Sequence, residues 1–171
     1  TWNVPSFKSV RRWLTKHTPD DVATCVIHGD FRLDNLVLDP DDPPSIRAVL
    51  DWEMATLGDP LMDLGNSLAY WVQADDDRVA RSTRRQPTHL EGMLTRNELV
   101  EAYFERSGRK KPDNWVFYEV YGIFRLAVII QQIYFRYFHG QTRNRAFKNF
   151  WFLVWYLDRR CRRLIRGRNL R

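Results

Sequence analysis

Residues that build metal and redox centres are scarce, because the 171 positions include only two cysteines and four histidines. Cys25 and Cys161 lie far apart and lack the paired spacing of a structural zinc site. Two isolated thiols are typical of a reducing compartment, so we expect a cytoplasmic protein. Long hydrophobic runs are also missing: the longest, 150–157, has eight residues, whereas a membrane-spanning helix needs roughly 20. We therefore expect no membrane partner and no secretion signal.

A uniformly basic surface is missing too, although the net charge is +6. Seven of the 27 basic residues are arginines within 159–171, a stretch without Asp or Glu. The remaining chain has 20 basic and 21 acidic residues, so the excess charge belongs to one terminal segment. A solvated helix end explains such a segment, and we do not expect a nucleic-acid partner.

One motif carries most of the functional information in the chain. Residues 28–35 read His-Gly-Asp-Phe-Arg-Leu-Asp-Asn, and Asp51 follows Asn35 after sixteen positions. Kinases assemble a phosphoryl-transfer site from the same pattern: an Asp, an Asn five residues later, and a second Asp after a hairpin-length gap. The pattern predicts an ATP-dependent kinase that acts on a hydroxyl group of a small molecule.

The residue most directly involved in the predicted reaction is Asp30. A carboxylate beside the acceptor hydroxyl orients that group and accepts its proton, so Asp30 is the predicted catalytic base. Arg32 follows two residues later and is a second catalytic candidate, because a guanidinium can bind the transferring phosphoryl group through two hydrogen bonds. An exposed loop arginine is the alternative interpretation of Arg32.

Two oxygen-bearing side chains are predicted to bind Mg²⁺ and, through it, the nucleotide. Asn35 offers a neutral carbonyl oxygen and Asp51 a charged carboxylate. Mg²⁺ prefers oxygen ligands and keeps several waters, so two protein ligands plus the phosphates of ATP are sufficient.

Two further residues are predicted to support the catalytic loop. His28 is interpreted as a structural histidine that fixes this loop, with proton transfer as the alternative. Asp63 lies one helical turn after Asp59, the predicted helix N-cap. An acidic residue there is favoured by the helix dipole alone, and its more specific role would be to accept backbone amides of the loop.

The elements around the motif predict how its parts come together. Leu36–Leu38 and Ile46–Leu50 read as strands, separated by the Asp- and Pro-rich turn 39–45. An antiparallel hairpin of these strands would bring Asn35 and Asp51 to the same end.

The rest of the chain is predicted to be helical, apart from a polar segment at 73–92 that we expect to be a mobile loop or a lid. The two last helices are aromatic nearly all round, which predicts that they are largely buried. Helices are expected at 6–16 with Ser6 as N-cap, from Pro60, from the Thr95-Glu98 capping box to Gly108, at 113–139 and at 145–166. The fold class is therefore α+β and mainly α-helical, with one small catalytic β-hairpin.

The motif and its surroundings resemble the aminoglycoside phosphotransferase family. The resemblance covers 28–36, the stretch Val-Leu-Asp-Trp-Glu-Met-Ala-Thr-Leu-Gly-Asp-Pro-Leu-Met-Asp-Leu-Gly at 49–65, and Phe-Arg-Leu-Ala at 124–127. Within the family, the chain is most similar to the branch associated with acyl-CoA dehydrogenases. The resemblance implies a protein-kinase-like fold that uses ATP and Mg²⁺.

The same resemblance assigns roles by position. It implies Asp30 as the base, Asn35 and Asp51 as metal ligands, and Asp63 as the brace of the catalytic loop. No Gly-rich phosphate loop and no lysine-bearing strand precede the motif, so 1–171 is expected to be one domain, the C-terminal lobe without its nucleotide-covering lobe. A functional link to an acyl-CoA dehydrogenase is also implied, with a hydroxylated acyl-CoA as one acceptor and an aminoglycoside-like compound as another.

Three other functions fit parts of the pattern. A kinase-like binding or regulatory module without catalysis is the main alternative, although it would have no need for Asp30, Asn35 and Asp51 together. A metal-dependent hydrolase would use His28, Asp30 and Asp51. A nucleic-acid adaptor would rely on the arginines of 159–171.

Overall fold

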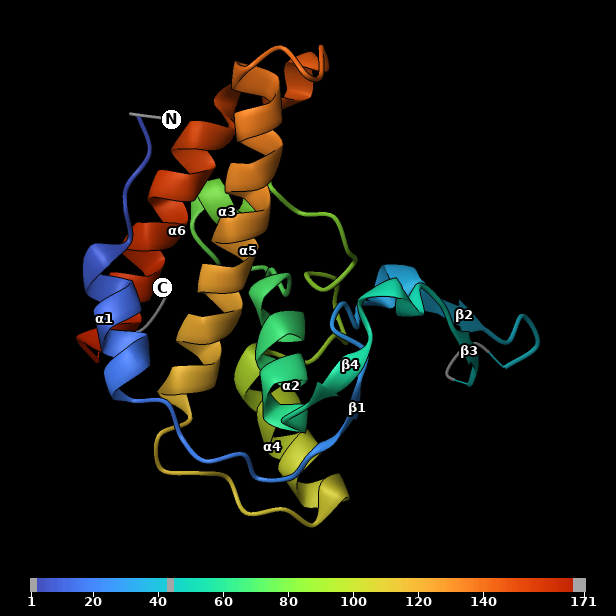
Figure 1. Cartoon of the computed structure of the whole chain (residues 1–171). Helices are drawn as coiled ribbons and strands as arrows, with labels where there is room; N and C mark the ends of the chain where they lie inside the picture. The colour runs from blue at the N-terminus through green and yellow to red at the C-terminus, as the bar shows by residue number, and fades with distance from the viewer. Residues whose placement is uncertain (1–2, 43–44, 168–171) are drawn as a thin grey trace.

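Two long antiparallel helices form the spine of the molecule, which we describe from a computed structural model over residues 3–42 and 45–167. The central helix, α5 (Val116–Phe138), packs along its length against α6 (Phe150–Ile165). α1 (Lys8–Lys16) lies beside both of them (Figure 1). By length and composition α5 could cross a membrane, but core helices meet the same test, and here α5 contacts α1, α2 and α6.

Two small antiparallel sheets lie on the opposite side of α2 (Pro60–Ala69) from this spine (Figure 1). The predicted hairpin is present, with β2 (Leu36–Leu38) paired to β3 (Ile46–Val49) and Leu36 opposite Val49. The second sheet, β1 (Cys25–Ile27) with β4 (Thr56–Gly58), was not predicted. Both of its strands have three residues, too few to display the alternation that identifies a strand in a sequence.

Helix-capping residues set two helix boundaries where the sequence predicts them. Asp59 caps α2, because its Oδ1 accepts the amide of Leu61 at 2.8 Å. Thr95 and Glu98 form the predicted capping box of α4 (Arg96–Ser107), which ends at Gly108 with φ of 65°. These boundaries could be predicted from the sequence because a capping side chain bonds to a backbone amide only two or three residues away.

The start of α1 differs from the prediction. Ser6 makes no cap; the helix begins at Lys8, after Phe7 in the left-handed region with φ of 52°. The ring of Phe7 is buried and lies 5.5 Å from that of Phe124. Burial of this ring, and not a hydroxyl cap, therefore sets the direction in which the chain enters the helix.

The segment 73–92 is attached to the body, contrary to the predicted mobile loop. It contains a short helix, α3 (Arg78–Ser82), and a buried ion pair that joins it to α4. Both carboxylate oxygens of Asp76 accept from the guanidinium of Arg96 at 2.7 Å. Thr88 is buried and exchanges two hydrogen bonds with the backbone of Val72.

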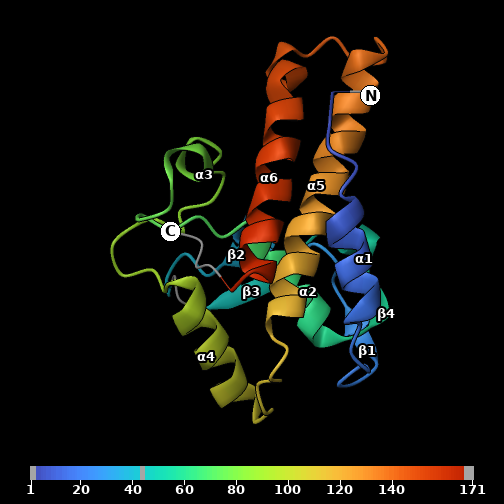
Figure 2. The same ribbon diagram turned by 90° about the vertical axis from the view of Figure 1, so that its left-hand side faces the viewer.

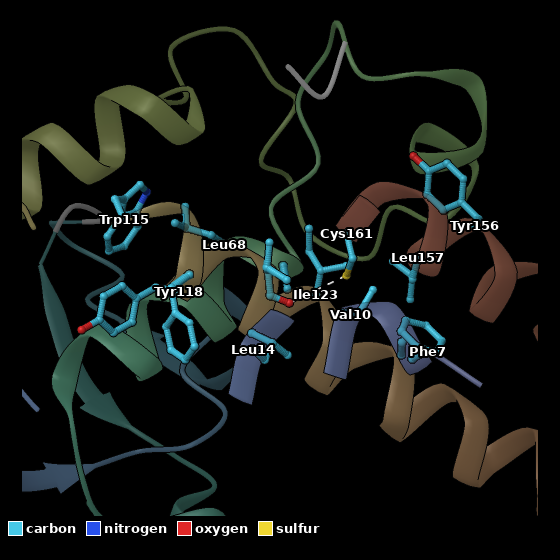
Figure 3. Packing of buried hydrophobic residues seen from close by; sticks show 14 of the residues in the cluster. Phe7, Val10, Leu14, Leu68, Trp115, Tyr118, Ile123, Tyr156, Leu157 and Cys161 are labelled. Carbon is cyan, nitrogen blue, oxygen red and sulfur yellow. Dashed lines mark hydrogen bonds between the residues drawn. The ribbon is translucent and has the colours of Figure 1, made fainter. Parts of the chain in front are cut away.

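The core lies between α1, α2, α5 and α6. The prediction that α5 and α6 are largely buried is wrong at one end of the pair, where the C-terminal part of α5 meets the N-terminal part of α6. Figure 3 shows Val10, Ile123, Leu157 and Cys161 gathered in the centre of the core. At the exposed end of the helix pair, five aromatic side chains are 39–48% exposed: Phe135, Phe138, Trp151, Phe152 and Trp155. The predicted helix 145–166 is also divided, because a 3-10 turn, η3 (Arg145–Asn149), precedes α6.

α2 and α5 cross at a pair of glycines, which we call the glycine crossing: Gly65 and Gly122. A Cβ added at Gly122 would overlap the carbonyl oxygen of Gly65. A Cβ added at Gly65 would overlap the carbonyl oxygen of Tyr118, which is fully buried on α5. The backbones therefore touch directly, and any side chain at these positions would push α2 away from the spine.

We predict that Gly122→Ala destabilises the protein, although the same change inside an exposed helix stabilises it by about 0.5–1 kcal/mol. Overpacking at the glycine crossing should cost about 2–3 kcal/mol net. Gln132→Ala, on the exposed face of the same helix, is the matched control and should change stability by less than about 0.5 kcal/mol. Urea unfolding measures both, and a Gly122→Ala protein as stable as wild type would contradict a direct backbone contact.

We also predict that Asp76→Asn destabilises the protein in a pH-dependent way. Burial acts to raise the pKa of Asp76, but its bonds to Arg96 hold the pKa below the ordinary value. The folded pKa is therefore depressed, so this stabilisation is present above the unfolded pKa of about 3.9 and is lost as the pH falls through the folded pKa.

Near pH 7, breaking this buried pair should cost about 3–5 kcal/mol. The difference from wild type should shrink below about pH 4. Asp75→Asn, at the exposed neighbouring position, serves as control with an expected change under about 0.5 kcal/mol. Equal unfolding curves of Asp76→Asn and wild type at neutral pH would rule out a stabilising ion pair.

Candidate active site

The turn that carries Asp30 is held by the first turn of α2. The carboxylate of Asp63 accepts two backbone amides, from His28 at 2.8 Å and from Gly29 at 2.9 Å. A carboxylate that accepts two amides makes charge-assisted bonds, which are stronger than neutral ones. Asp63 therefore fixes the backbone immediately before Asp30.

Gly29 has a conformation that a side chain would disturb. Its φ is +78°, and a Cβ there would lie 2.5 Å from the carbonyl oxygen of Met54. Gly29, two residues after β1, therefore combines a left-handed backbone with a close approach to the segment that follows Asp51, and glycine meets both requirements.

The helix that supplies Asp63 is itself tied to the core. Asp59 is buried, and its Oδ2 accepts the hydroxyl of Tyr118 at 3.1 Å and the amide of Val22 at 3.3 Å. Burial and the neighbouring Asp59 carboxylate raise the pKa of Tyr118 far above its ordinary value, so the phenol stays protonated and donates. This bond links the start of α2 to α5.

His28 joins the turn to the end of the hairpin. Its side chain is buried, with Nδ1 accepting the amide of Asp30 at 3.2 Å and Nε2 lying 2.7 Å from the carbonyl oxygen of Leu50. Because Nδ1 is an acceptor, the proton must sit on Nε2, and the imidazole is neutral. Both nitrogens are used, so His28 is not available to the metal-dependent hydrolase that we considered as an alternative.

Asn35 lies at the mouth of the hairpin and makes three contacts with the catalytic segment and β3. Its side-chain Nδ2 donates to the carbonyl oxygen of Asp30 at 2.9 Å. Its backbone amide donates to the carbonyl oxygen of Arg32, and its backbone carbonyl accepts the amide of Leu50 at 2.8 Å. With the nitrogen engaged in the protein, the side-chain Oδ1 is the atom with the chemistry to bind a cation.

Asp51 directly follows the residue that is bonded to Asn35. Its backbone is left-handed, with φ of 65°, which is uncommon for a residue other than glycine. Its side chain is exposed and makes no cap on the short 3-10 turn that follows, η2 (Trp52–Met54). A strained backbone with an exposed carboxylate is typical of a functional position.

Together Asn35 and Asp51 give an all-oxygen donor set that fits a hard divalent cation retaining water and phosphate ligands. No group of three or more His, Cys, Asp or Glu within 3–42 and 45–167 is arranged to hold a metal alone.

Arg32 lies against the predicted base instead of extending into solvent. Its Nη2 is 3.2 Å from Oδ2 of Asp30, and its Nη1 is 3.6 Å from Oδ2 of Asp34. The guanidinium also lies 4.8 Å above the ring of Tyr70, whose pKa is raised by burial and then by Asp30. Its Nε is buried and has no hydrogen-bond partner within the described part of the chain.

A largely apolar cleft of about 710 Å³ lies beside the catalytic turn. Its walls come from β1, the hairpin, α2 and α4, and include Phe31, Leu64 and Tyr103. Arg32 and Arg106 are its cationic residues, while Asp30, Asn35 and Asp51 lie outside its walls. Sequence reasoning missed the α4 side of the cleft, because its residues follow the same spacing as any buried helix face.

Gln86 is a second residue that sequence reasoning missed. It is buried, lines the cleft, and accepts the amide of Leu33 at 2.9 Å from 53 positions away. No local pattern connects these two positions, so only the three-dimensional structure reveals the contact.

Comparisons with known proteins agree with this arrangement. The sequence profile of the phosphotransferase enzyme family matches residues 3–99, a range that contains Asp30, Asn35, Asp51 and Asp63 but not Tyr103 and Arg106 of the cleft. Among curated proteins, acyl-CoA dehydrogenase family member 10 of Mus musculus is 39% identical over 145 residues, which cover 84% of this chain and 13% of that protein. Member 11 of Rattus norvegicus is 37% identical over 145 residues, covering 83% of this chain and 18% of that protein. The chain therefore spans less than a fifth of these relatives.

A solved structure gives the corresponding result for the fold. A protein from Ralstonia eutropha, provisionally described as an aminoglycoside phosphotransferase, superposes with a TM-score of 0.78 and 27% identity. The superposition covers 97% of this chain and 50% of the neighbour. The predicted fold class, mainly helical with small antiparallel strands and kinase-like, is confirmed.

We predict that Gly29→Ala destabilises the protein more than Gly92→Ala does. Both glycines have positive φ, +78° and +86°, but a Cβ at Gly92 would meet nothing within 4 Å. Gly92→Ala should therefore cost only the backbone strain of about 1 kcal/mol, whereas Gly29→Ala should cost about 3 kcal/mol. Urea unfolding of the two variants isolates the close approach to Met54, and equal losses would show that this approach is unimportant.

Proposed function

Because the chain belongs to the phosphotransferase enzyme family, we propose that it is the catalytic part of a kinase that phosphorylates a hydroxyl group of a small molecule with ATP. The observation that carries this proposal is the pair of hydrogen bonds by which the Asp63 carboxylate holds the turn that presents Asp30, next to the open end of the hairpin. Phosphoryl transfer requires a rigidly held turn of this kind, because the reaction depends on the positioning of the reacting groups and on charge.

In this proposal, Asp30 binds the acceptor hydroxyl and takes its proton as the oxygen attacks the γ-phosphorus of ATP. The bond between that phosphorus and the β,γ-bridging oxygen breaks, and ADP leaves. Arg32 holds Oδ2 of Asp30, which leaves Oδ1 for the acceptor. The positive charge of the Arg32 guanidinium, beside Asp30, is suited to stabilise the transferring phosphoryl group.

Asn35 and Asp51 would hold Mg²⁺, which neutralises charge on the nucleotide phosphates when bound. The hydrogen bond between Leu50 and Asn35 keeps these two residues at adjacent positions across the hairpin. His28, bonded to Leu50, would keep the base and the cation ligands in a fixed relation.

We further propose that the acceptor is a hydroxylated acyl-CoA and not an aminoglycoside. The apolar cleft can bind an acyl chain, and Arg106 can bind an anionic group of the carrier. An aminoglycoside carries several ammonium groups, which these walls and the two arginines would disfavour. The names of the relatives from Mus musculus and Rattus norvegicus support a link to acyl-CoA dehydrogenase.

We predict that Asp30→Asn lowers turnover about 10²- to 10⁴-fold and leaves the protein folded, because an amide cannot accept the proton. The measurement is ADP release by the full natural protein with ATP, Mg²⁺ and a hydroxyacyl-CoA, and separately with an aminoglycoside. Asp51→Asn should raise the Mg²⁺ concentration needed for half-maximal rate. Asp39→Asn, an exposed hairpin carboxylate paired with Arg47, is the matched control and should retain wild-type turnover.

Two results would contradict the proposal. Undiminished turnover by Asp30→Asn would remove Asp30 from the mechanism. A wild-type protein that neither binds ATP with Mg²⁺ nor releases ADP with either acceptor would instead point to the non-catalytic module.

A further inference from the structure

The polar segment 73–92 contacts the catalytic turn through one buried side chain. The segment leaves α2, forms α3 and passes toward α4 (Figure 2). The pair between Asp76 and Arg96 ties it to α4, and the bonds between Thr88 and Val72 close it onto the end of α2. The position of Gln86, two residues before Thr88, is therefore fixed by the scaffold.

Pro87 restricts Gln86 further. A residue before proline is confined largely to extended backbone, which reduces the entropy that Gln86 loses when it is ordered. Its side chain is 5% exposed, so its amide group must be satisfied inside the protein. Oε1 meets this requirement by accepting the amide of Leu33.

Leu33 begins the single turn that follows the predicted base, Asp30, and ends at the predicted cation ligand, Asn35. That turn is η1 (Leu33–Asn35), and its N-cap, Arg32, makes no side-chain cap. The first amide of a helical turn has no partner within the turn and needs one from elsewhere. Gln86 supplies this missing cap from the other side of the cleft.

The loop is consequently fixed at two places by two different elements. Asp63 holds the amides of His28 and Gly29 ahead of Asp30, and Gln86 holds the amide of Leu33 after it. Arg32, which bonds Asp30, lies inside the span between these two supports.

On the basis of the proposed function, we infer that Gln86 is a positioning residue for phosphoryl transfer. It caps η1 and thereby fixes Arg32 and Asp30 relative to an acceptor in the cleft. Loss of its acceptor oxygen should loosen the loop 31–35 while the support from Asp63 remains.

The variant that tests this is Gln86→Met, which keeps the length of the side chain and removes the oxygen. Amide hydrogen exchange at 31–35 should accelerate roughly five- to tenfold, as expected for one lost hydrogen bond. Thr83→Val is the matched control: it removes the bond from the hydroxyl to the carbonyl oxygen of Ala80 in the same segment and touches neither Gln86 nor the catalytic loop. Exchange at 31–35 should stay within about twofold of wild type in this control.

Kinetics on the full natural protein with ATP, Mg²⁺ and a hydroxyacyl-CoA provide the second measurement. Gln86→Met should lower kcat about tenfold with KM for ATP nearly unchanged, because the bond between Asn35 and Leu50 across the hairpin is untouched. Unchanged exchange in Gln86→Met, equal acceleration in Thr83→Val, or faster exchange with an unchanged kcat would each overturn the inference.

Failure of the proposed function gives a different result. A wild-type protein without ATP turnover would end both the kinase assignment and the catalytic role of Gln86. The exchange data would still show whether Gln86 holds the loop, because they require no substrate.

Discussion

The carboxylate of Asp63 connects the helical scaffold to the turn on which the proposed chemistry depends. Both of its oxygens are committed to backbone amides, so the turn cannot rotate without losing two charge-assisted bonds. Because Asp63 belongs to the first turn of α2, the direction of Asp30 follows from the placement of α2. That placement follows in turn from the glycine crossing and from the bond between Asp59 and Tyr118. The packing of the core therefore determines the position of the site.

The site itself consists of short irregular segments, each of which has a partner far away in the sequence. The His28 ring and the Asn35 carbonyl both hydrogen-bond to the backbone of Leu50, and the amide of Leu33 donates to the side chain of Gln86. Irregular backbone cannot satisfy its own amides, so these bonds replace the ones that a regular helix or sheet would provide. The result is a preorganised set of oxygens, which reduces the reorganisation needed when charge develops during phosphoryl transfer.

The sequence predicts those features that are encoded locally. The Asp-Asn-Asp spacing, the hairpin and the caps of α2 and α4 depend on neighbouring residues, and patterns of neighbouring residues are visible in one dimension. The support from Gln86 and the burial of Phe7 depend on tertiary contacts instead, so the sequence did not reveal them. The prediction of a mobile loop at 73–92 was wrong for the same reason: its polar residues resemble a solvated loop, yet Asp76 is polar because it pairs with Arg96 in the interior.

In the proposed function, the reaction and the acceptor are supported by different helices. α2 holds the catalytic turn through Asp63, whereas α4 supplies the opposite wall of the cleft with Tyr103 and Arg106. α4 is joined to the segment 73–92 by the Asp76–Arg96 pair and to the end of α2 by the bond from Arg96 to the carbonyl oxygen of Trp71. Substitutions at Tyr103 or Arg106, which make neither of these bonds, would alter the shape and charge of the cleft without breaking them. Within the described residues, Gln86 belongs to both systems, because it lines the cleft and caps η1. An acceptor that contacts Gln86 would consequently act on the catalytic turn as well, which couples recognition of the acceptor to alignment of the reacting groups.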